Sequence, residues 1–362
     1  MRRRILYIMH VDWDWAKQRP HFLAEHLSAH HDVLVLYPYA RVRKNLVKND
    51  RTSLRLLPFF PIASTGGFLP VRNFINGVSR ILMRMVIRWH RPDLVWISSP
   101  DMFDYLPKPL PCRLVYDCMD DILAFPSNLW RKDWLGALEA DLIHASDCVF
   151  CSSNNLRRKL SVRSGSNKKL VIVHNAFEPA AFAITPANSE KVKLDGRRIF
   201  GYIGTISSWF DFETLLRVVN EFKLIEIHIL GPNENMESKA PRHERIKYLG
   251  AVRHDTIPIY VSQFDALIMP FKVIDLIRSV DPVKLYEYVY FNKPIVSVWY
   301  EEIDRFSEFA DFYTTHQELS LIIDRYLKEG FKKKYTDAQQ LRFINSNTWE
   351  DRVQQIQEYL YN

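Results

Sequence analysis

Short apolar runs alternate along the chain with longer segments whose apolar residues recur every three or four positions. The short runs are typical of buried β-strands, and the longer segments have the period of amphipathic helices. In the first half, the predicted strands are Ile5–Met9, Asp32–Tyr37, Leu54–Pro58, Leu94–Ser98, Arg113–Tyr116, Cys148–Cys151 and Leu170–His174. The predicted helices between them are Gln18–His30, Val71–Trp89, Trp130–Ser146 and Asn154–Leu160.

The alternation stops at Glu178–Arg198, a polar segment that contains Pro179 and Pro186 and has no clear period. This composition indicates a linker. After it, the predicted strands are Ile199–Ile203, Ile225–Leu230, Ile246–Leu249, Ala266–Met269 and Ile295–Val298. The predicted helices are Trp209–Phe222, Asp255–Gln263 and Pro282–Phe291, and the chain ends in helical patterns, the last being Trp349–Tyr361.

Strands that alternate with helices are typical of a parallel sheet covered on both faces. The sequence therefore predicts an α/β protein with two Rossmann-like domains joined by the linker. A chain of 362 residues is long enough for two such domains. We expect the first domain at residues 1–183, the second at 184–345 and a separate C-terminal helix at 346–362.

Composition narrows the class of protein. Residues are 47% hydrophobic and 13% aromatic, which excludes a disordered chain. The net charge of +7 favours anionic partners such as nucleotide phosphates or phospholipid headgroups. Because zinc-finger spacing, an RNP-like strand and dense Lys/Arg blocks are all lacking, we expect no nucleic-acid partner.

The sequence also bears on location and redox state. It contains no run of 18 apolar residues, and the apolar run Ile5–Met9 is too short for a signal-peptide core, so we expect a cytoplasmic protein. Cys148 and Cys151 have the spacing of a redox or metal pair, but no second pair accompanies them. We interpret the cysteines as reduced thiols and expect neither a metal nor a bound cofactor.

The sequence lacks GxGxxG, GxxxxGK[ST] and GxSxG motifs, so a phosphate site would need other means. The strongest local signal is a helix with Asp281 as predicted N-cap and Pro282 as first residue. Free backbone N–H groups at Val283 and Lys284 would form an anion site. Glu287, one turn on, could accept hydrogen bonds from two ribose hydroxyls. The alternative is a plain capped helix with solvated charges.

Two other segments carry candidate chemistry. Asp117, Asp120 and Asp121 follow the strand predicted at Arg113–Tyr116, and carboxylates so close raise one another's pKa. We expect Asp117 and Asp120 to act as a catalytic base or to orient a hydroxyl; a solvated, helix-capping turn is the alternative. The segment Phe68–Trp89 is apolar at helical spacing with arginines interspersed. It predicts either a peripheral contact with an anionic membrane or a core helix with a solvated basic side.

Six segments, by their order and spacing, resemble GT-B glycosyltransferases of the family-4 type, especially bacterial polysaccharide enzymes. They are Trp13–His21, Val115–Asp121, Cys151–Leu156, Val173–Ala176, Gly201–Ser207 and Ser279–Val296. The resemblance implies two domains that face a cleft, with the acceptor bound by the N-terminal domain and the donor by the C-terminal one. It also implies transfer with retention, and a C-terminal helix that packs back on the N-terminal domain.

By the same resemblance, Glu287 is the second Glu of the family's E-x7-E motif and would bind the donor ribose. Ser279 stands where the first Glu is expected, and the loop at Gly204 lacks the usual Arg. The donor-binding residues that the resemblance implies are Gly204, Thr205, Ser207, Lys272, Arg278, Ser279, Val283, Lys284, Leu285 and Glu287, with Gly231 and Val252 beside the base.

The first loop is a further candidate. Asp12-Trp13-Asp14 looks like the metal-binding DxD of the other glycosyltransferase fold, but it directly follows the first strand, too early for that role. The resemblance implies instead a loop that faces acceptor and diphosphate. We therefore expect Asp14 and Arg19 on the acceptor side, and no metal.

Together these features predict a hexosyltransferase that uses a nucleoside diphosphate sugar, with a UDP-sugar favoured. The expected acceptor is a hydroxyl of a glycan or lipid-linked glycan, in the biosynthesis of a cell-surface polysaccharide such as lipopolysaccharide or capsule. The expected place is the cytoplasm or the inner face of its membrane. One alternative is a nucleotide-sugar epimerase of the same fold. Another is a non-catalytic subunit of a polysaccharide assembly complex, which Ser279 in place of the Glu supports.

Overall fold

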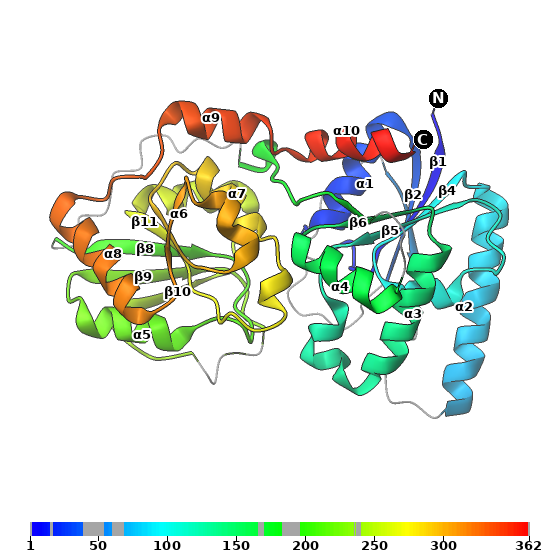
Figure 1. Ribbon diagram of the computed structural model, residues 1–362, viewed down its shortest axis with the longest axis horizontal. Coiled ribbons are helices and arrows are strands. Elements are labelled where there is room, and N and C mark those ends of the chain that lie inside the picture. Colours follow the sequence, from blue (N-terminus) through cyan, green and yellow to red (C-terminus); the bar gives the residue numbers. More distant parts are fainter. Residues whose placement is uncertain are drawn as a thin grey trace. The chain divides into compact units, whose positions relative to one another are not determined.

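The computed structural model describes residues 2–14, 17–38, 54–59, 69–165, 170–182, 196–234, 236 and 240–360, with side chains of the helix at 69–90 from residue 76 onward. The chain divides into two compact units (Figure 1). Unit 1 comprises Met1–Asn175 and Trp349–Asn362, and unit 2 comprises Ala176–Thr348. The boundary expected from the sequence was between 183 and 184; residues 183–195 of the expected linker lie outside the described residues.

Unit 1 is built on a parallel sheet of seven strands in the order β3-β2-β1-β4-β5-β6-β7. These strands are β1 (Arg4–Ile8), β2 (Asp32–Pro38), β3 (Arg55–Phe59), β4 (Leu94–Ile97), β5 (Arg113–Cys118), β6 (Cys148–Cys151) and β7 (Leu170–Ile172). Its helices are α1 (Arg19–His30), α2 (Leu69–His90), α3 (Lys132–Ala145), α4 (Asn154–Ser164) and α10 (Trp349–Leu360), with short 3-10 helices η1 (Pro100–Tyr105), η2 (Ile122–Ala124) and η3 (Pro126–Arg131). The strand order reverses between β1 and β4, so ligands are expected at the carboxyl ends of these strands.

Unit 2 repeats this plan with six parallel strands in the order β10-β9-β8-β11-β12-β13. They are β8 (Arg198–Ile203), β9 (Ile225–Leu230), β10 (Ile246–Gly250), β11 (Ala266–Met269), β12 (Ile295–Val298) and β13 (Ala310–Tyr313). The helices are α5 (Phe212–Glu221), α6 (Ile257–Gln263), α7 (Val283–Tyr290), α8 (His316–Glu329) and α9 (Asp337–Asn345), with 3-10 helices η4 (Pro179–Phe182), η5 (His254–Thr256), η6 (Ile277–Ser279) and η7 (Glu301–Phe306). Here the order reverses between β8 and β11.

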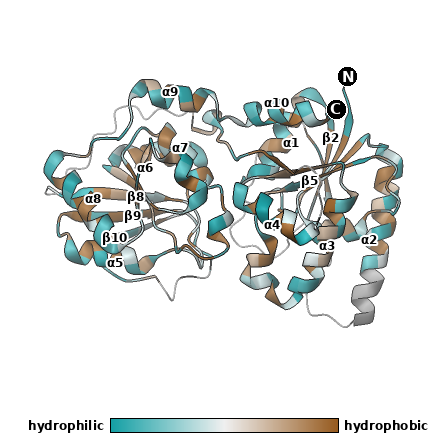
Figure 2. Cartoon of the chain, in the orientation of Figure 1, coloured by the Kyte–Doolittle hydropathy of each residue, from teal (hydrophilic) through white to brown (hydrophobic). Residues whose placement is uncertain are grey.

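Burial explains why these runs form strands. Every residue of β4, β6 and β11 is buried, as strands covered by helices on both faces require. Hydrophobic residues accordingly follow the strands of both sheets in Figure 2. Cys148 and Cys151 are buried free thiols in β6. In the described part of the chain, no helix is long and apolar enough to cross a membrane.

The last helix is part of unit 1. α10 packs on α1, where the rings of Trp349 and Phe22 stack with centroids 5.3 Å apart. Glu350 lies between His26 and His30, with carboxylate oxygens 3.2 Å from a ring nitrogen of each. The chain therefore leaves unit 1 after Asn175 and rejoins it at Trp349.

The α/β prediction is confirmed, and every strand predicted from the sequence is present with ends within two residues. The strand β13 was not predicted, because its run of four residues, Ala-Asp-Phe-Tyr, is short and contains an acid. The predicted helix start at Asp281 was wrong, because the first helical residue of α7 is Val283 and its N-cap is Pro282.

Candidate functional site

The carboxyl edge of the unit 2 sheet carries a set of closely packed loops. The loop after β8 pairs with the loop after β9 at Ile206 and Asn233, and with the loop after β11 at Phe210 and Phe271. The backbone N–H of Gly204 also donates to the carbonyl of Leu230 (2.8 Å). The loop after β8 is therefore fixed on both sides at the point where the strand order reverses.

Two glycines allow this close packing. Gly204 and Gly231 have φ values of 141° and 148°, which side-chain-bearing residues rarely adopt. A Cβ on Gly231 would lie 2.0 Å from the carbonyl oxygen of Gly204, so the loops approach at a distance that only glycine permits. The result is a partly exposed strip of backbone beside the first turn of α7.

Lys284, in that first turn, lies directly across Gly204. A Cβ on Gly204 would be 2.0 Å from Cε and 2.7 Å from Nζ of Lys284. The ammonium also lies over the rings of Tyr202 and Phe271, 6.0 and 5.7 Å from their centroids. Among the described residues, no carboxylate lies within ion-pair distance of Lys284. The ammonium is therefore positioned beside bare backbone, where an anion could neutralise it.

Glu287 lies one turn further along α7. Burial raises the pKa of its carboxyl to about 7, although the charge of Lys284 opposes this shift. Burial likewise lowers the pKa of Lys284, against the effect of Glu287 and Glu234. Within the described part of the chain, the Glu287 carboxylate has no hydrogen-bond partner. An acid and a base that are both partly desolvated, with no ion-pair or hydrogen-bond partner among the described residues, are typical of a site for a polar ligand.

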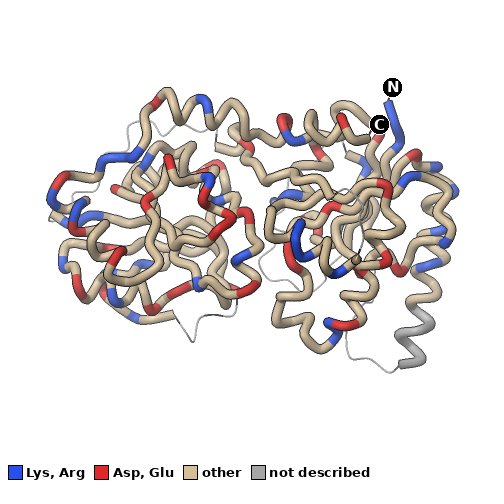
Figure 3. The backbone as a smooth tube through the Cα atoms, viewed as in Figure 1, with Lys and Arg blue, Asp and Glu red and all other residues tan. Residues whose placement is uncertain are grey.

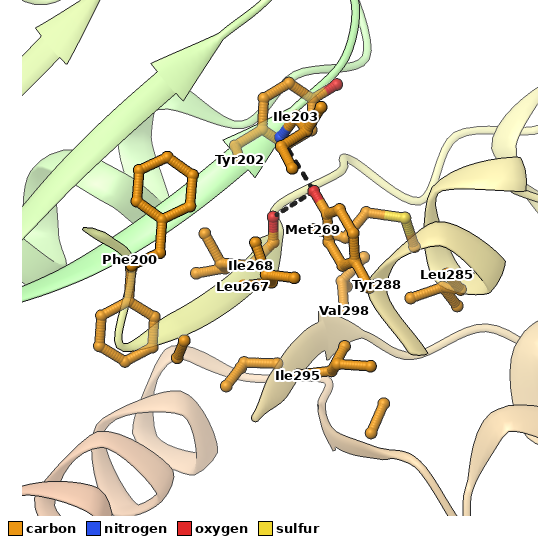
Figure 4. Packing of buried hydrophobic residues seen from close by; sticks show 14 of the residues in the cluster. Phe200, Tyr202, Ile203, Leu267, Ile268, Met269, Leu285, Tyr288, Ile295 and Val298 are labelled. Carbon is orange, nitrogen blue, oxygen red and sulfur yellow. Dashed lines mark hydrogen bonds between the residues drawn. The ribbon is translucent and has the colours of Figure 1, made fainter. Parts of the chain in front are cut away.

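Tyr288 fixes the orientation of α7. β8 and β11 pair only through Phe200 and Gly201, and beyond these residues the two strands separate. In this gap the Tyr288 hydroxyl accepts from the N–H of Ile203 (3.0 Å) and donates to the carbonyl of Ile268 (3.3 Å), as Figure 4 shows. The residue is fully buried. α7 is thus bound to both central strands, which sets the positions of Lys284 and Glu287.

Asp281 has a different role from the predicted one. Its buried carboxylate does not cap α7 but accepts hydrogen bonds from the Tyr286 hydroxyl (3.0 Å) and from Arg305 of η7. Arg305 also donates to the Tyr286 hydroxyl. This cluster, in which Asp281 and Tyr286 are buried and Arg305 is not, fixes the loop before α7. Tyr286, Tyr288 and Arg305 were not predicted from the sequence, because tyrosines at alternate positions of a helix are usually packing residues and Arg305 lies in a later segment.

The other expected donor residues lie on the same loops. Thr205 and Val283 are partly exposed, Ser207 and Leu285 are buried, and Lys272 and Arg278 are exposed on the segment between β11 and α7. Val252 is partly exposed and follows β10. It lies two residues after Gly250, whose carbonyl accepts a hydrogen bond from the Gly231 N–H. Ser279 is completely buried, so its hydroxyl does not take the place of an exposed carboxylate.

In unit 1, Arg19 and Asp117 form a buried ion pair. The Arg19 guanidinium donates through Nε and Nη2 to the Asp117 carboxylate (2.7–3.1 Å), and the side chains are 1% and 0% exposed. Arg19 also donates to the carbonyl of Val173 (2.8 Å) and to Oδ1 of Asn175 (3.2 Å). The pair joins α1, β5 and the segment after β7. The catalytic role expected for Asp117 and the acceptor role expected for Arg19 stay predictions.

Asp120 differs from its two acidic neighbours. Burial raises its pKa to about 6, with Arg19 opposing and Asp121 adding to the shift. Asp121 instead binds Lys159 (2.9 Å) and Arg163 (2.6 Å), which outweigh burial and lower its pKa. The expectation that the carboxylates raise one another's pKa is therefore wrong for Asp121. The side chain of Asp120 has no hydrogen-bond partner among the described residues.

The first loop is held by local contacts. Oδ1 of Asp12 accepts from the backbone N–H of Asp14 (3.0 Å). His21 Nδ1 accepts from the N–H of Gln18, so its Nε2 donates to the carbonyls of Asp12 and Trp13. Burial lowers the pKa of His21 to about 4, which keeps the ring neutral. In the ranges that the structure describes, no three His, Cys, Asp or Glu side chains gather closely enough to hold a metal ion.

Comparison with known proteins places this geometry in context. No protein-family model matches the chain. A Bacillus subtilis (strain 168) protein, named a teichuronic acid biosynthesis glycosyltransferase, TuaH, is 25% identical over 198 residues. The match covers 51% of this chain and 50% of the relative, so it spans about half the length of that protein.

Solved structures match almost the whole chain. Sucrose-phosphate synthase from Thermosynechococcus elongatus superposes with a TM-score of 0.75 at 13% identity, covering 99% of this chain and 98% of that chain. Anabaena Alr3699/HepE in complex with UDP and glucose gives a TM-score of 0.70 at 14% identity, covering 99% and 100%. At such identities the likeness establishes the fold. The chain has the GT-B fold with two Rossmann-like domains, which confirms the fold expected from the sequence.

Proposed function

We propose that this protein is a glycosyltransferase that takes its sugar from a nucleoside diphosphate sugar bound at the α7 edge of unit 2. The observation that supports this most is the pair Lys284 and Glu287. Neither side chain has an ion-pair or hydrogen-bond partner in the described part of the chain, and Lys284 stands beside the backbone of Gly204. A nucleoside diphosphate has a partner for each of them, because its phosphates can bind the Lys284 ammonium and its ribose hydroxyls can bind the Glu287 carboxylate.

The donor would lie as follows. Its diphosphate binds the first N–H groups of α7 and the Lys284 ammonium, while exposed Lys272 and Arg278 add positive charge. Glu287, as the carboxylate, accepts hydrogen bonds from the ribose hydroxyls. The loops at Gly231 and Val252 contact the base. When the glycosidic bond to the diphosphate breaks, the charge that develops on the leaving group is stabilised by these same donors.

The finer assignment rests on resemblance and on the relatives. We propose a retaining, family-4 type enzyme that prefers a UDP-sugar, in line with the UDP and glucose bound in Anabaena HepE. The acceptor is a hydroxyl of a glycan or lipid-linked glycan of a cell-surface polysaccharide, in line with the name of the Bacillus relative. Unit 1 binds it, with Asp120 as the group that orients or deprotonates the hydroxyl. The proposed location is the cytoplasm, at the inner face of its membrane.

Calorimetric titration with UDP, GDP, CDP and dTDP tests the donor site. We expect UDP to bind, and Glu287→Ala and Lys284→Ala each to weaken binding roughly 10–100-fold, because each removes a charged partner of the ligand. The matched controls are Glu308→Ala and Lys247→Ala, both exposed in unit 2 away from α7. If no nucleotide binds, or if the site variants bind it as tightly as the controls do, the proposed donor site is wrong.

One observation favours a second candidate. Ser279 stands where the family has a Glu that contacts the donor sugar, and it is completely buried. A non-catalytic subunit of a polysaccharide assembly complex could retain the nucleotide site and lack this contact. Purified protein that binds UDP but neither hydrolyses nor transfers sugar from any UDP-sugar, with a glycan acceptor supplied, would favour this candidate.

A further inference from the structure

α2 presents three distinct faces between residues 76 and 90. Side chains at intervals of four residues form rows along a helix. The first row, Ser79, Met83 and Ile87, is buried, and so is His90 beside it. This face packs against unit 1 and contributes Met83 and Ile87 to its core. The core contact therefore occupies only one side of the helix.

A second face is apolar and open to solvent. Ile81, Met85 and Trp89 form one row, and they are 57%, 61% and 64% exposed. Val78 and Leu82 form the adjacent row and are also exposed. Single exposed apolar residues are common, but five on one stripe of a single helix are not. The stripe points away from the core face, so the packing of unit 1 does not explain it.

The third face is basic. Arg80, Arg84 and Arg88 form the row between the core face and the apolar stripe, and all three are exposed. Arg80 pairs with Asp104 (2.8 Å), whereas neither Arg84 nor Arg88 has an ion-pair partner within the described ranges. The helix contains no Asp or Glu, and in Figure 3 the described part of α2 is accordingly blue and tan, with blue at its arginines. Arg55 adds a further cation over the Trp89 ring, 5.1 Å from its centroid.

We propose that this stripe docks on an anionic phospholipid membrane. An interfacial helix buries its apolar side chains at the boundary between headgroups and acyl chains while its cations contact lipid phosphates. Trp89 suits that boundary, because its ring is apolar and its N–H is polar. The long arginines reach the headgroup plane from the row beside the stripe. α2 thus supplies both the apolar area and the positive charge that stable peripheral binding needs.

A second copy of the chain fits this surface less well. A symmetric dimer through the stripe would bring two rows of arginines together with no acid on either helix. Such like-charge contacts are destabilising. Anionic lipid headgroups, in contrast, neutralise Arg84 and Arg88.

This inference rests on the membrane location included in the proposed function, and it identifies α2 as the surface that contacts the membrane. Its test uses neither nucleotide nor acceptor. The glycosyltransferase proposal and the membrane surface can therefore fail separately.

The experiment is sedimentation of the full chain with vesicles of phosphatidylcholine mixed with phosphatidylglycerol, compared with vesicles of phosphatidylcholine alone. We expect binding to the mixed vesicles that weakens as salt is raised. Arg84→Gln/Arg88→Gln should weaken it roughly 30-fold, since each surface cation contributes about a factor of 5 near anionic lipid. Met85→Ser/Trp89→Ser should weaken it at least about tenfold.

Matched controls separate the stripe from general surface effects. Leu321→Ser/Leu341→Ser removes two residues that are similarly exposed, at 65% and 58%, in unit 2. Arg157→Gln/Lys223→Gln removes two exposed cations elsewhere. Both controls should bind vesicles as the unaltered chain does. The proposal is overturned if the unaltered chain ignores the mixed vesicles or if the α2 variants bind like the controls. It is also overturned if the chain is a dimer that Met85→Ser/Trp89→Ser dissociates.

Discussion

The side chain of Lys284 crosses the backbone of Gly204 so closely that residue 204 has no room for a Cβ. That atom would lie 2.0 Å from Cε of Lys284, well inside van der Waals contact. The contact links the loop after β8 to the first turn of α7, across the point where the strand order reverses. A short loop and a helix end, separated by 80 residues of sequence, therefore form one surface.

Gly204→Ala should accordingly disrupt the donor site. The methyl group displaces Lys284, and the φ of 141° at this position adds strain of about 1–3 kcal/mol. We expect the affinity for UDP to fall at least about tenfold. Gly165→Ala is the control, because Gly165 also has a positive φ but a Cβ there meets no atom within 4 Å. It should lose some stability and leave UDP binding unchanged.

A double variant sharpens this prediction. In Gly204→Ala/Lys284→Ala the clash is absent, because the displaced side chain is gone. The loss of affinity should then be smaller than the sum of the two single losses. Additive losses in calorimetric titrations would show that the two residues act independently, contrary to the close approach of Lys284 to Gly204.

Tyr288→Phe should destabilise unit 2 without removing a charge. The substitution leaves the N–H of Ile203 and the carbonyl of Ile268 without the hydroxyl that joins them. Unsatisfied buried groups of this kind cost about 1–3 kcal/mol each. Urea unfolding should show that loss, with a weaker affinity for UDP because α7 is less firmly held. Tyr290→Phe is the control, since Tyr290 is only partly buried and no hydrogen bond of its hydroxyl occurs among the described residues. Equal stability of the two variants would contradict the role of Tyr288.

The strand pattern could be predicted from the sequence because it depends on local chemistry. Runs such as Cys148–Cys151 and Ala266–Met269 are wholly apolar and are each preceded by an Asp, so burial on both faces was the simplest explanation. Local sequence also sufficed to place Lys284 and Glu287 on the first turns of one helix. Charged residues at that spacing next to Pro282 define a helix end with little dependence on the rest of the chain.

The contacts of the site could not be predicted, because they depend on distant residues. Asp281 has the sequence context of an N-cap, yet Arg305, 24 residues later, binds its carboxylate instead. A solvated acidic turn was the alternative considered for Asp117, but Arg19, 98 residues earlier in the chain, holds its carboxylate in a buried ion pair. In each case a long-range partner outweighed a correct local preference, and one sequence contains no signal for such a pairing.

The ion pair of Arg19 and Asp117 should contribute to folding more than to chemistry. Arg19→Met leaves a buried carboxylate without its partner, which costs about 3–5 kcal/mol. Arg19→Met/Asp117→Asn removes both charges, so its free energy of unfolding should lie closer to that of the unaltered protein. Urea unfolding of both variants measures the difference. A double variant as unstable as Arg19→Met would show that the lost hydrogen bonds to Val173 and Asn175, and not the charge, dominate the cost.

Asp120 should control the pH dependence of transfer. With a pKa of about 6, its carboxyl gains a proton as pH falls through 6 and can then no longer accept one from an acceptor hydroxyl. We expect kcat/KM for transfer to fall below pH 6, and Asp120→Asn to lower kcat without destabilising the protein. Asp133→Asn, an exposed acid on α3, is the control. A low-pH decline that persists unchanged in Asp120→Asn would assign the titration to another group.

Glu287 should make both stability and donor binding depend on pH. Its pKa of about 7 in the folded protein exceeds the ordinary value of 4.5. Between these values the folded protein holds a proton that the unfolded chain lacks, so the free energy of unfolding falls as pH rises from about 4.5 to 7. Glu287→Gln should remove that decline. In the unaltered protein, ribose hydroxyls need the ionised carboxylate, so UDP should bind about tenfold more weakly at pH 6 than at pH 8.

The Gln variant also controls for the nucleotide, whose own phosphate titrates in the same range. Calorimetric titrations of both proteins between pH 6 and pH 8 give the dissociation constant for UDP at each pH. The ratio of the two constants isolates the contribution of residue 287. We expect the ratio to change by about tenfold, because only the unaltered protein must release a proton from Glu287 before the ribose can bind. A constant ratio would mean that Glu287 is already ionised when the nucleotide arrives. Its pKa in the free protein would then lie below this range, contrary to the rise that burial causes.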